Sequence, residues 1–375
     1  MSPRWQLNLD RAFFLEQYWQ RRPLLVRGAI EGFEPPIDAN ELAGLAMEEE
    51  VEARIIEQHN GRWQLEHGPF ADNAYQRPAP WTLLVQSVDH YIPDVEDLRR
   101  MVDFIPQWRA DDVMVSYAVD GGSVGPHYDN YDVFLLQGEG ERLWQLGQNC
   151  DESSRLLPHD ELRILDQFTV KQEFLLQCGD MLYVPPGLAH WGVARGECTT
   201  FSLGFRAPRI VDMVSRWADQ LVESIEGAEF YQDPERDTSI RPGEISATDV
   251  HQVRETMRKA LESVKDEHWF GELVTEPRSE PPPLDGDARA YLASGFSQVE
   301  LLGAARLAWQ HQPNNAVQVY ANGVSRTFAA SVIPILEQLC GNGSFRIEQS
   351  KNNKAPNDRS ALFEFLLETG VIHVQ

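Results

Sequence analysis

The chain has 375 residues, 42% of them hydrophobic and 24% charged, which is ordinary for a globular protein with at least one sizeable core. Its formal net charge of −25 argues against direct binding to nucleic acid, because an acidic body repels phosphate backbones and attracts cationic partners. A simpler interpretation, in which the acidic surface only keeps the protein soluble, stays open.

The cysteines and the N-terminal segment bear on the location of the protein. Cys150, Cys178, Cys198 and Cys340 are scattered without a CxxC pair, which argues against a disulfide framework or a cysteine zinc site and fits a reducing cytoplasm. The segment MSPRWQLNLDRAFF does not resemble a signal peptide, and no apolar run approaches membrane-spanning length. We therefore expect a cytoplasmic protein without membrane contact.

The first hundred residues predict mixed structure, and strands dominate after them. FFLEQYWQRR is amphipathic and predicts a helix, whereas PLLVRGA and WTLLVQSV predict strands. From about Asp111 to Phe205, short runs rich in Val, Leu, Phe and Tyr are separated by Gly, Pro, Asn or Asp. These runs are DVMVSYAV, DVFLLQG, RLWQLG, EFLLQ, DMLYVPP and TTFSLGF. Many short strands with turn signals between them predict an antiparallel barrel or jelly roll.

Past Pro208 the pattern changes to helices. IVDMVSRWADQLVESI and the stretch from Val250 to Val264, which follows the cap candidates Ser246 and Thr248, carry apolar residues at helical spacing. With no obvious partner inside the barrel, these two helices are expected to pack on each other or on a second subunit, so we expect a homodimer.

The C-terminal segment predicts a small α+β domain. VQVYANGVSRTF contains two strands around Asn322-Gly323, a dipeptide favoured in two-residue hairpin turns; helical runs follow at 329–340 and 359–369, and then the strand VIHVQ. From Phe296 onward, six acidic and six basic residues cancel, and this neutrality counts against a nucleic-acid reader. Gripping a protein substrate or stabilising a dimer is the more plausible role.

The expected domain order follows from these patterns. A jelly-roll domain with N-terminal helical elements covers 1–208, a helical region 209–276, a linker of composition PRSEPPPLDGD 277–287, and the α+β domain 288–375.

Two segments carry the chemistry, GGSVGPHYDNYDVFLLQ and CGDMLYVPPGLAHWGV. In the first, His127 and Asp129 are two residues apart, and alternate residues of a strand face the same side with Cα atoms roughly 6.6 Å apart. In the second, Gly179-Asp180 predicts a turn, a strand follows, and Pro185-Pro186-Gly187 turns the chain back to deliver His190. An imidazole pair and a carboxylate placed in this way can converge on one ion.

Two histidines and one carboxylate on one face of a metal leave three coordination positions open, the arrangement typical of non-haem Fe(II) oxygenases. A 2-oxo acid can take two of these positions, and dioxygen the third. HxD alone is a weak signal and Pro-Pro-Gly alone is only a turn. Their combination in a strand-rich region predicts an iron site at His127, Asp129 and His190.

The double motif is similar to that of the JmjC/cupin oxygenases, whose jelly roll binds Fe(II) and 2-oxoglutarate. YWQRRPLLVRGA, SYAVDGGSVGPHYDNYDVFLLQGEGERLWQLG, GDMLYVPPGLAHWG and SLGFRAP resemble the bacterial ribosomal oxygenases, which hydroxylate an arginine of a large-subunit ribosomal protein. The resemblance covers most of residues 10–210 and continues more loosely through FYQDP, HWFGELV and VYANG. It implies a helical dimerisation region and a winged-helix-like C-terminal domain.

The resemblance also implies roles for three further residues. Arg142 is the candidate for binding the distal carboxylate of 2-oxoglutarate, since a guanidinium can grip a carboxylate bidentately; alternatively it is a surface arginine between acidic neighbours. Ser116 matches a position that contacts the cosubstrate. Asp120 matches the position that receives the substrate arginine, although an Asp-Gly-Gly turn would also explain it.

Three functions remain in competition at this point. The first is arginine hydroxylation of a ribosomal protein by dioxygen and 2-oxoglutarate. The second is hydroxylation of another residue such as histidine, or demethylation of N-methyl-lysine, by the same oxygenase class. The third is a non-catalytic cupin-fold binding protein whose metal site is structural or empty. The open coordination positions count against the third, because a structural site gains nothing from them.

Overall fold

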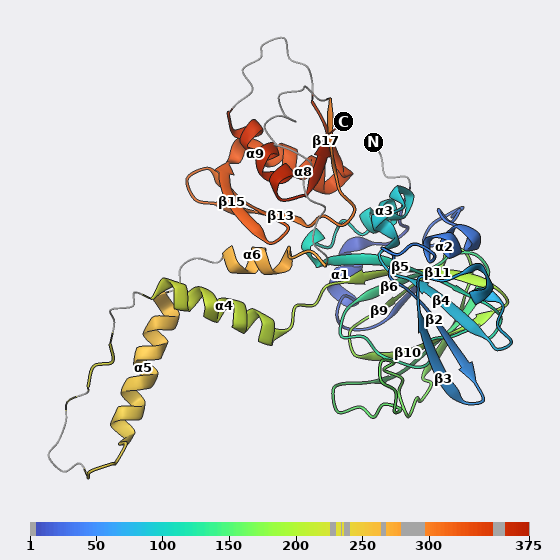
Figure 1. Cartoon of the computed structure of the whole chain (residues 1–375), viewed down its shortest axis with the longest axis horizontal. Coiled ribbons are helices and arrows are strands. Elements are labelled where there is room, and N and C mark those ends of the chain that lie inside the picture. The colour runs from blue at the N-terminus through green and yellow to red at the C-terminus, as the bar shows by residue number, and fades with distance from the viewer. Residues whose placement is uncertain are drawn as a thin grey trace.

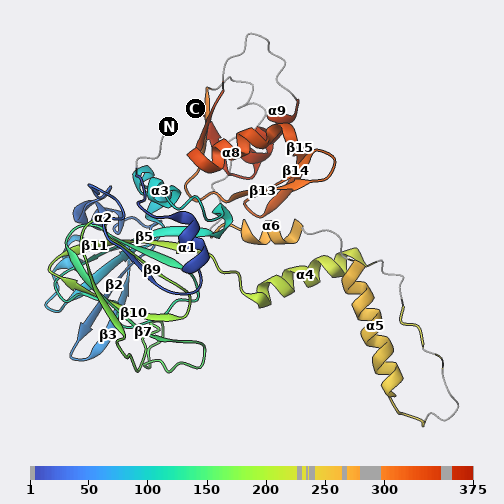
Figure 2. The ribbon, with the colours of Figure 1, turned by 180° about the vertical axis from the view of Figure 1, so that it is seen from behind.

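The structure is a computed structural model that describes residues 5–225, 230–233, 235, 241–263, 268–278, 297–347 and 357–374. In the opposite views of Figures 1 and 2, a large β-rich body lies beside a smaller C-terminal body, and helices α4 (Ile210–Ser224) and α5 (Ala247–Ser263) extend away from both. No helix among the described residues is long and apolar enough to cross a membrane.

The N-terminal elements supply four strands of the large sheet, β1 to β4, and the helices that cover one of its faces. They are α1 (Arg11–Gln17), β1 (Leu24–Val26), α2 (Ala39–Leu45), β2 (Ala53–His59), β3 (Arg62–His67), η1 (Asp72–Tyr75), β4 (Trp81–Val85), η2 (Val88–His90), α3 (Pro93–Arg100) and η3 (Gln107–Arg109). Helix α1 begins where the Asp10 carboxylate accepts a hydrogen bond from the Phe13 backbone. The sequence pattern predicts α1, β1 and β4, but it misses the β2–β3 hairpin because β3 carries few apolar positions.

The jelly roll consists of two antiparallel sheets. Its remaining strands are β5 (Ala110–Ala118), β6 (Val133–Gln137), β7 (Glu141–Asn149), β8 (Gln172–Leu176), β9 (Met181–Val184), β10 (Leu188–Arg195) and β11 (Cys198–Phe205). The eight-stranded sheet has the order β1-β9-β6-β11-β5-β4-β2-β3, and the three-stranded sheet has the order β10-β7-β8. The predicted runs all form strands, and β10 is the strand that the run-by-run pattern does not name.

Strand β6 is buried along its whole length because both faces of the large sheet are covered. Val133 and Leu135 pack with Trp144 in the core between the two sheets. Phe134 and Leu136 join the other core, which the N-terminal helices cover. This double burial explains why DVFLLQ reads as a continuous apolar run rather than an alternating one.

In its described residues, 297–347 and 357–374, the C-terminal body contains two small antiparallel sheets, the helices α8 and α9, and the short 3-10 helix η4. Its elements are β12 (Gln298–Leu301), β13 (Leu307–Gln312), β14 (Ala316–Ala321), β15 (Val324–Ala329), η4 (Ala330–Val332), α8 (Ile333–Asn342), β16 (Ser344–Arg346), α9 (Asn357–Glu368) and β17 (Ile372–Val374). The sheet orders are β16-β12-β17 and β13-β14-β15. As predicted, Asn322 and Gly323 join β14 to β15, and both have the positive φ angles of a hairpin turn, 46° and 81°.

The two bodies are joined by a buried arginine and by the segment around α6 (His268–Val274). The guanidinium of Arg306, which precedes β13, donates to the carbonyl of Ala110 at 2.7 Å and to that of Asp111 at 2.5 Å. On the other side, Ser325 of β15 donates a hydrogen bond to Glu272 of α6 at 2.8 Å.

The domain order agrees with the prediction, whereas the boundaries at 208, 276 and 287 stay predictions. Helix α6 falls in the segment expected to be helical, yet it packs on β14 and β15 of the C-terminal body. The predicted linker 277–287 lies outside the described residues beyond Arg278.

Candidate metal centre and cosubstrate cavity

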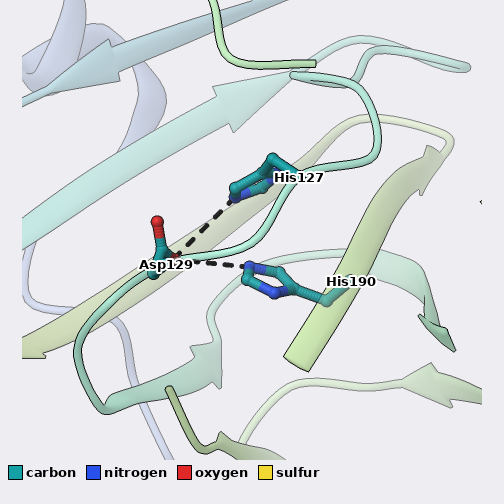
Figure 3. Close-up of side chains that lie close together, drawn as sticks. All are labelled: His127, Asp129 and His190. Carbon is teal, nitrogen blue, oxygen red and sulfur yellow. Dashed lines mark ion pairs between the residues drawn. The ribbon is translucent and has the colours of Figure 1, made fainter. Parts of the chain in front are cut away.

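His127 and Asp129 lie in the loop between β5 and β6. The expectation that the HxD pair sits in a strand is wrong in detail: His127 forms an isolated antiparallel bridge, and Asp129 is irregular. Gly125 has a φ of +83°, and Pro126 lacks a backbone donor, so the chain leaves regular sheet geometry here. The two-residue spacing nevertheless directs both side chains to one side (Figure 3).

His190 comes from the start of β10, on the three-stranded sheet. Its backbone bonds reciprocally with that of His127, with N···O distances of 3.0 and 2.8 Å. Three residues before His190, the Gly187 amide donates a hydrogen bond to the carbonyl of Asp129 at 2.7 Å. The Pro-Pro-Gly turn therefore delivers His190, as the sequence predicts, and its Gly187 also holds the backbone of Asp129, which was not predicted.

The three side chains form a compact set of potential ligands. Their ligand atoms all lie within 4.8 Å of one another. Asp129 Oδ2 is 4.0 Å from His127 Nε2 and 3.6 Å from His190 Nε2, the two pairs that Figure 3 marks. Among the described residues this is the group of His, Cys, Asp and Glu side chains with metal-site geometry.

Backbone carbonyls fix the orientation of both imidazoles. His127 Nδ1 lies 3.0 Å from the carbonyl of Gly125, and His190 Nδ1 lies 3.0 Å from that of Leu188. Donation from Nδ1–H leaves Nε2 as the lone-pair nitrogen, directed toward Asp129. This is the usual arrangement around a histidine that binds a metal.

Electrostatics also favours metal binding. Burial, followed by the neighbouring His127, lowers the pKa of His190 to about 4, so its imidazole is neutral near pH 7, as a ligand must be. The charge of Asp129, together with burial, raises the pKa of Tyr131, which keeps this phenol protonated beside the carboxylate.

A cavity of about 310 Å³ connects the three potential ligands with Arg142 and Ser116. Arg142 enters it from the start of β7, after a tight turn in which Gly140 has a φ of +67° and a Cβ would collide with the Glu197 carbonyl. Ser116 enters it from β5 and is buried. The structure thus brings both predicted cosubstrate residues to the predicted metal ligands.

Arg142 is only 4% exposed, and its Nε and Nη2 atoms have no hydrogen-bond partner within the described structure. A buried, unpaired cation is costly, so the cavity is built for an anionic group. The interpretation of Arg142 as a surface residue among glutamates therefore fails. Trp144 lies beside it, with the guanidinium 5.9 Å from the indole centre.

Asp120 is not brought to the same cavity. Its side chain is exposed, its Oδ1 accepts a hydrogen bond from the Gly196 amide at 2.8 Å, and it is not among the cavity-lining residues. Its role in binding the substrate stays a prediction. Its hydrogen bond to Gly196 agrees with the alternative, in which Asp120 is a turn residue.

The cavity has an acidic wall that the sequence reasoning missed. Asp111 and Asp112 line it, and both form ion pairs with Arg278. Asp112 also accepts hydrogen bonds from the amide and hydroxyl of Ser87, both at 2.9 Å. The adjacent acidic pair at the start of β5 was the available signal, but nothing in the sequence linked it to Arg278.

Comparison with known proteins defines the class. Residues 97–213 match the JmjC domain, and residues 257–370 match the ROXA-like winged helix. The Escherichia coli protein YcfD, solved as a ribosomal oxygenase, superposes with a TM-score of 0.82 at 32% identity, covering 99% of both chains. Another YcfD structure, in complex with cobalt and 2-oxoglutarate, gives a TM-score of 0.79 over the same shares. The jelly roll and its site are thus those of a JmjC protein.

Two relatives narrow the class further. The ribosomal protein uL16 3-hydroxylase of E. coli is 36% identical over 326 residues, which is 85% of this chain and 86% of that protein. A probable ribosomal oxygenase of Haemophilus influenzae is 38% identical over 235 residues, 62% of this chain and 56% of that protein. The chain belongs to the JmjC-type bacterial ribosomal oxygenases, and its predicted fold, with the winged helix, is confirmed.

Replacing His127 with alanine should remove metal binding while leaving the fold intact, because this side chain is partly exposed whereas His190 is buried. Titration with Co²⁺, followed by visible absorption, should give an affinity at least about a hundredfold weaker than wild type. His59→Ala, at the exposed β2–β3 hairpin, is the matched control and should bind as wild type. Equal affinity in both variants would rule out the metal assignment.

Proposed function

We propose that this protein is an Fe(II)- and 2-oxoglutarate-dependent oxygenase that hydroxylates an arginine side chain of a large-subunit ribosomal protein. The observation that carries the proposal is the cavity itself. Three convergent potential metal ligands lie at one part of it, and at another lies the buried guanidinium of Arg142, two nitrogen atoms of which have no hydrogen-bond partner among the described residues. A ligand that chelates a metal through one end and carries a second carboxylate satisfies both.

In this proposal His127, Asp129 and His190 would hold Fe(II), and the 2-oxo acid and dioxygen would bind beside them. When bound, iron and 2-oxoglutarate supply the oxidising power for transferring one oxygen atom from dioxygen, with succinate and carbon dioxide as coproducts. The chain's own part is positioning. Arg142 grips the distal carboxylate, Ser116 lines the same cavity, and the Gly125 and Leu188 carbonyls hold the imidazole tautomers.

The substrate class is supported by a relative's name and by charge. The E. coli relative is named for hydroxylation of ribosomal protein uL16, and the acidic body of this chain attracts basic proteins. Asp120 remains the candidate for contact with the target arginine, because its carboxylate is exposed. A ribosomal-protein substrate is also the basis for proposing a cytoplasmic location.

The decisive experiment incubates a ribosomal-protein mixture with the enzyme, Fe(II) and 2-oxoglutarate, and measures intact masses against the His127→Ala variant. We expect one large-subunit protein to gain one oxygen, located on an arginine by fragmentation. A gain of oxygen on histidine would instead indicate a histidine hydroxylase, and a loss of methyl groups would indicate a lysine demethylase. Slow succinate formation without any modified protein would refute the ribosomal substrate, and no succinate at all would favour the binding protein.

Arg142→Ala should raise the apparent KM for 2-oxoglutarate by about 10- to 100-fold, since a charge-assisted bidentate contact is lost. Metal content should stay at the wild-type level, because Arg142 is not among the potential ligands. Arg142→Lys keeps the charge but lacks the planar fork, so its KM for 2-oxoglutarate should lie between those of the wild type and Arg142→Ala. Parallel loss of metal and of cosubstrate affinity would instead make Arg142 a structural residue.

We also propose that the chain forms a homodimer through α4 and α5. Both helices extend from the body in Figures 1 and 2 and expose large apolar side chains. On α5 these recur at helical spacing and form one stripe, which is expected to need a covering surface. The stripe consists of Val250, Val253, Met257 and Leu261.

Met257→Asp should weaken dimerisation by at least about tenfold, because a charge would be buried in an apolar contact. Sedimentation velocity over a concentration series measures the dissociation constant. Gln252→Asp adds the same charge on the opposite side of α5 and serves as the control, which should remain dimeric. A wild-type chain that sediments as a monomer at all concentrations would contradict the proposal.

A further inference from the structure

A second cavity, of about 470 Å³, lies where η3, α4, α6, β13 and β14 meet. Of the described residues that line it, most are aromatic and none carries a charge. Its volume falls in the range of ligand-binding pockets. In Figures 1 and 2 helix α6 lies between α4 and the C-terminal sheet, where these elements come together. The aromatic residues are Trp108, Trp217, Trp269, Phe270, Trp309 and Tyr320.

The chemistry of this aromatic cavity suits a cationic side chain. Indole rings are the strongest π partners for a guanidinium or an ammonium group, and several rings around one cavity can share one cation. The chain already makes such a contact here: the Arg109 guanidinium lies 5.7 Å from the centre of a Trp108 ring. Tyr320 adds a polar end to the cavity, with its hydroxyl 3.0 Å from the side-chain oxygen of Gln310.

The surrounding charge is also negative. Helix α6, which supplies Trp269 and Phe270, also carries Glu272, and Glu276 follows it; these two carboxylates form an acidic border beside the cavity. Arg216 lies 3.7 Å from Glu272 and 3.6 Å from Glu276, so it neutralises only part of this acidic border. Together with the net charge of −25, this border attracts a basic chain to the cavity.

The described linings of the aromatic cavity and the cosubstrate cavity have no residue in common, but both draw on the same two stretches of chain. Trp108 lines the former, while Asp111 lines the latter. In the same way, Val274 lines the aromatic cavity and Arg278 the other one. Three residues of extended chain span only ~10 Å. One substrate segment can therefore place its target in the cosubstrate cavity and another side chain, a few residues away, in the aromatic cavity.

We propose that the aromatic cavity is a second attachment site for an arginine or lysine side chain of the same basic protein substrate. This inference rests on the proposed function for the identity of the substrate. Its physical basis, the binding of a cationic side chain by uncharged rings within an acidic border, is independent of the oxygenase chemistry.

The binding test uses the metal-free full-length protein and an eight-residue peptide of alternating glycine and arginine, followed by isothermal titration. Trp217→Leu and Trp309→Leu should each weaken binding by about tenfold, because leucine keeps apolar bulk but has no π face. The corresponding Phe variants should lose less, about threefold. Phe13→Leu removes an exposed aromatic ring outside the cavity and should bind as wild type.

Two results would overturn the proposal: equal affinity for a glycine–glutamine peptide, or wild-type affinity in both Leu variants. A changed sedimentation coefficient with unchanged peptide affinity would instead assign the cavity to a contact between copies of the chain. Should Trp309→Leu fail to fold, Trp217→Leu on the projecting helix α4 still decides.

Turnover separates this proposal from the proposed function. The Leu variants should raise the KM for the intact protein substrate about tenfold and leave kcat and the KM for 2-oxoglutarate unchanged, because the rings lie outside the cosubstrate cavity. Peptide affinity that depends on the rings, in a protein that hydroxylates nothing, would refute the oxygenase function and retain a cation site. Hydroxylation by the Leu variants with an unchanged KM for the protein substrate would support the oxygenase function and refute the second attachment site.

Discussion

The active site depends on a short backbone bridge. His127 and His190 exchange two hydrogen bonds between their main chains. His127 lies in the loop that joins β5 to β6 of the eight-stranded sheet, whereas His190 lies in β10 of the three-stranded sheet. This pairing sets the separation of the two imidazoles, and the bond from Gly187 to the Asp129 carbonyl places the third ligand. The three side chains are thus held by hydrogen-bonded main chain before any metal arrives, which limits the reorganisation that binding requires.

Arg142 shows what this preorganisation costs. Its guanidinium is buried beside the cosubstrate cavity, and two of its nitrogen atoms have no hydrogen-bond partner in the part of the chain that the structure describes. A protein selected for stability alone would place an apolar residue there, since an unpaired buried cation is unfavourable. The structure tolerates the cost because the cavity supports an anion, so binding energy from a carboxylate offsets it. Burial serves His190 in a related way: it lowers the pKa of the imidazole, which keeps the ring neutral and able to bind a metal.

How much was predictable from sequence depends on how far apart the interacting residues lie along the chain. The potential ligands were predictable because HxD and the Pro-Pro-Gly-x-x-His turn are local patterns with one chemical meaning. The hairpin at Asn322-Gly323 was predictable because its dihedral angles follow from those two residues. The aromatic cavity was not predictable, because its tryptophans come from η3, α4, α6 and β13, and each one alone reads as ordinary core.

Asp111 connects these separate features. Arg206, Arg278 and Arg306 all pair with it, so it ties the jelly roll to the segment after α6 and to the C-terminal body. Although burial alone would raise the pKa of Asp111, these arginines hold it below its usual value, so the carboxylate stays charged. Because Asp111 also lines the cosubstrate cavity, its ion pair with Arg306 connects the C-terminal body directly to a wall of that cavity. The winged helix therefore supports the site through this contact, although none of its described residues is a potential metal ligand.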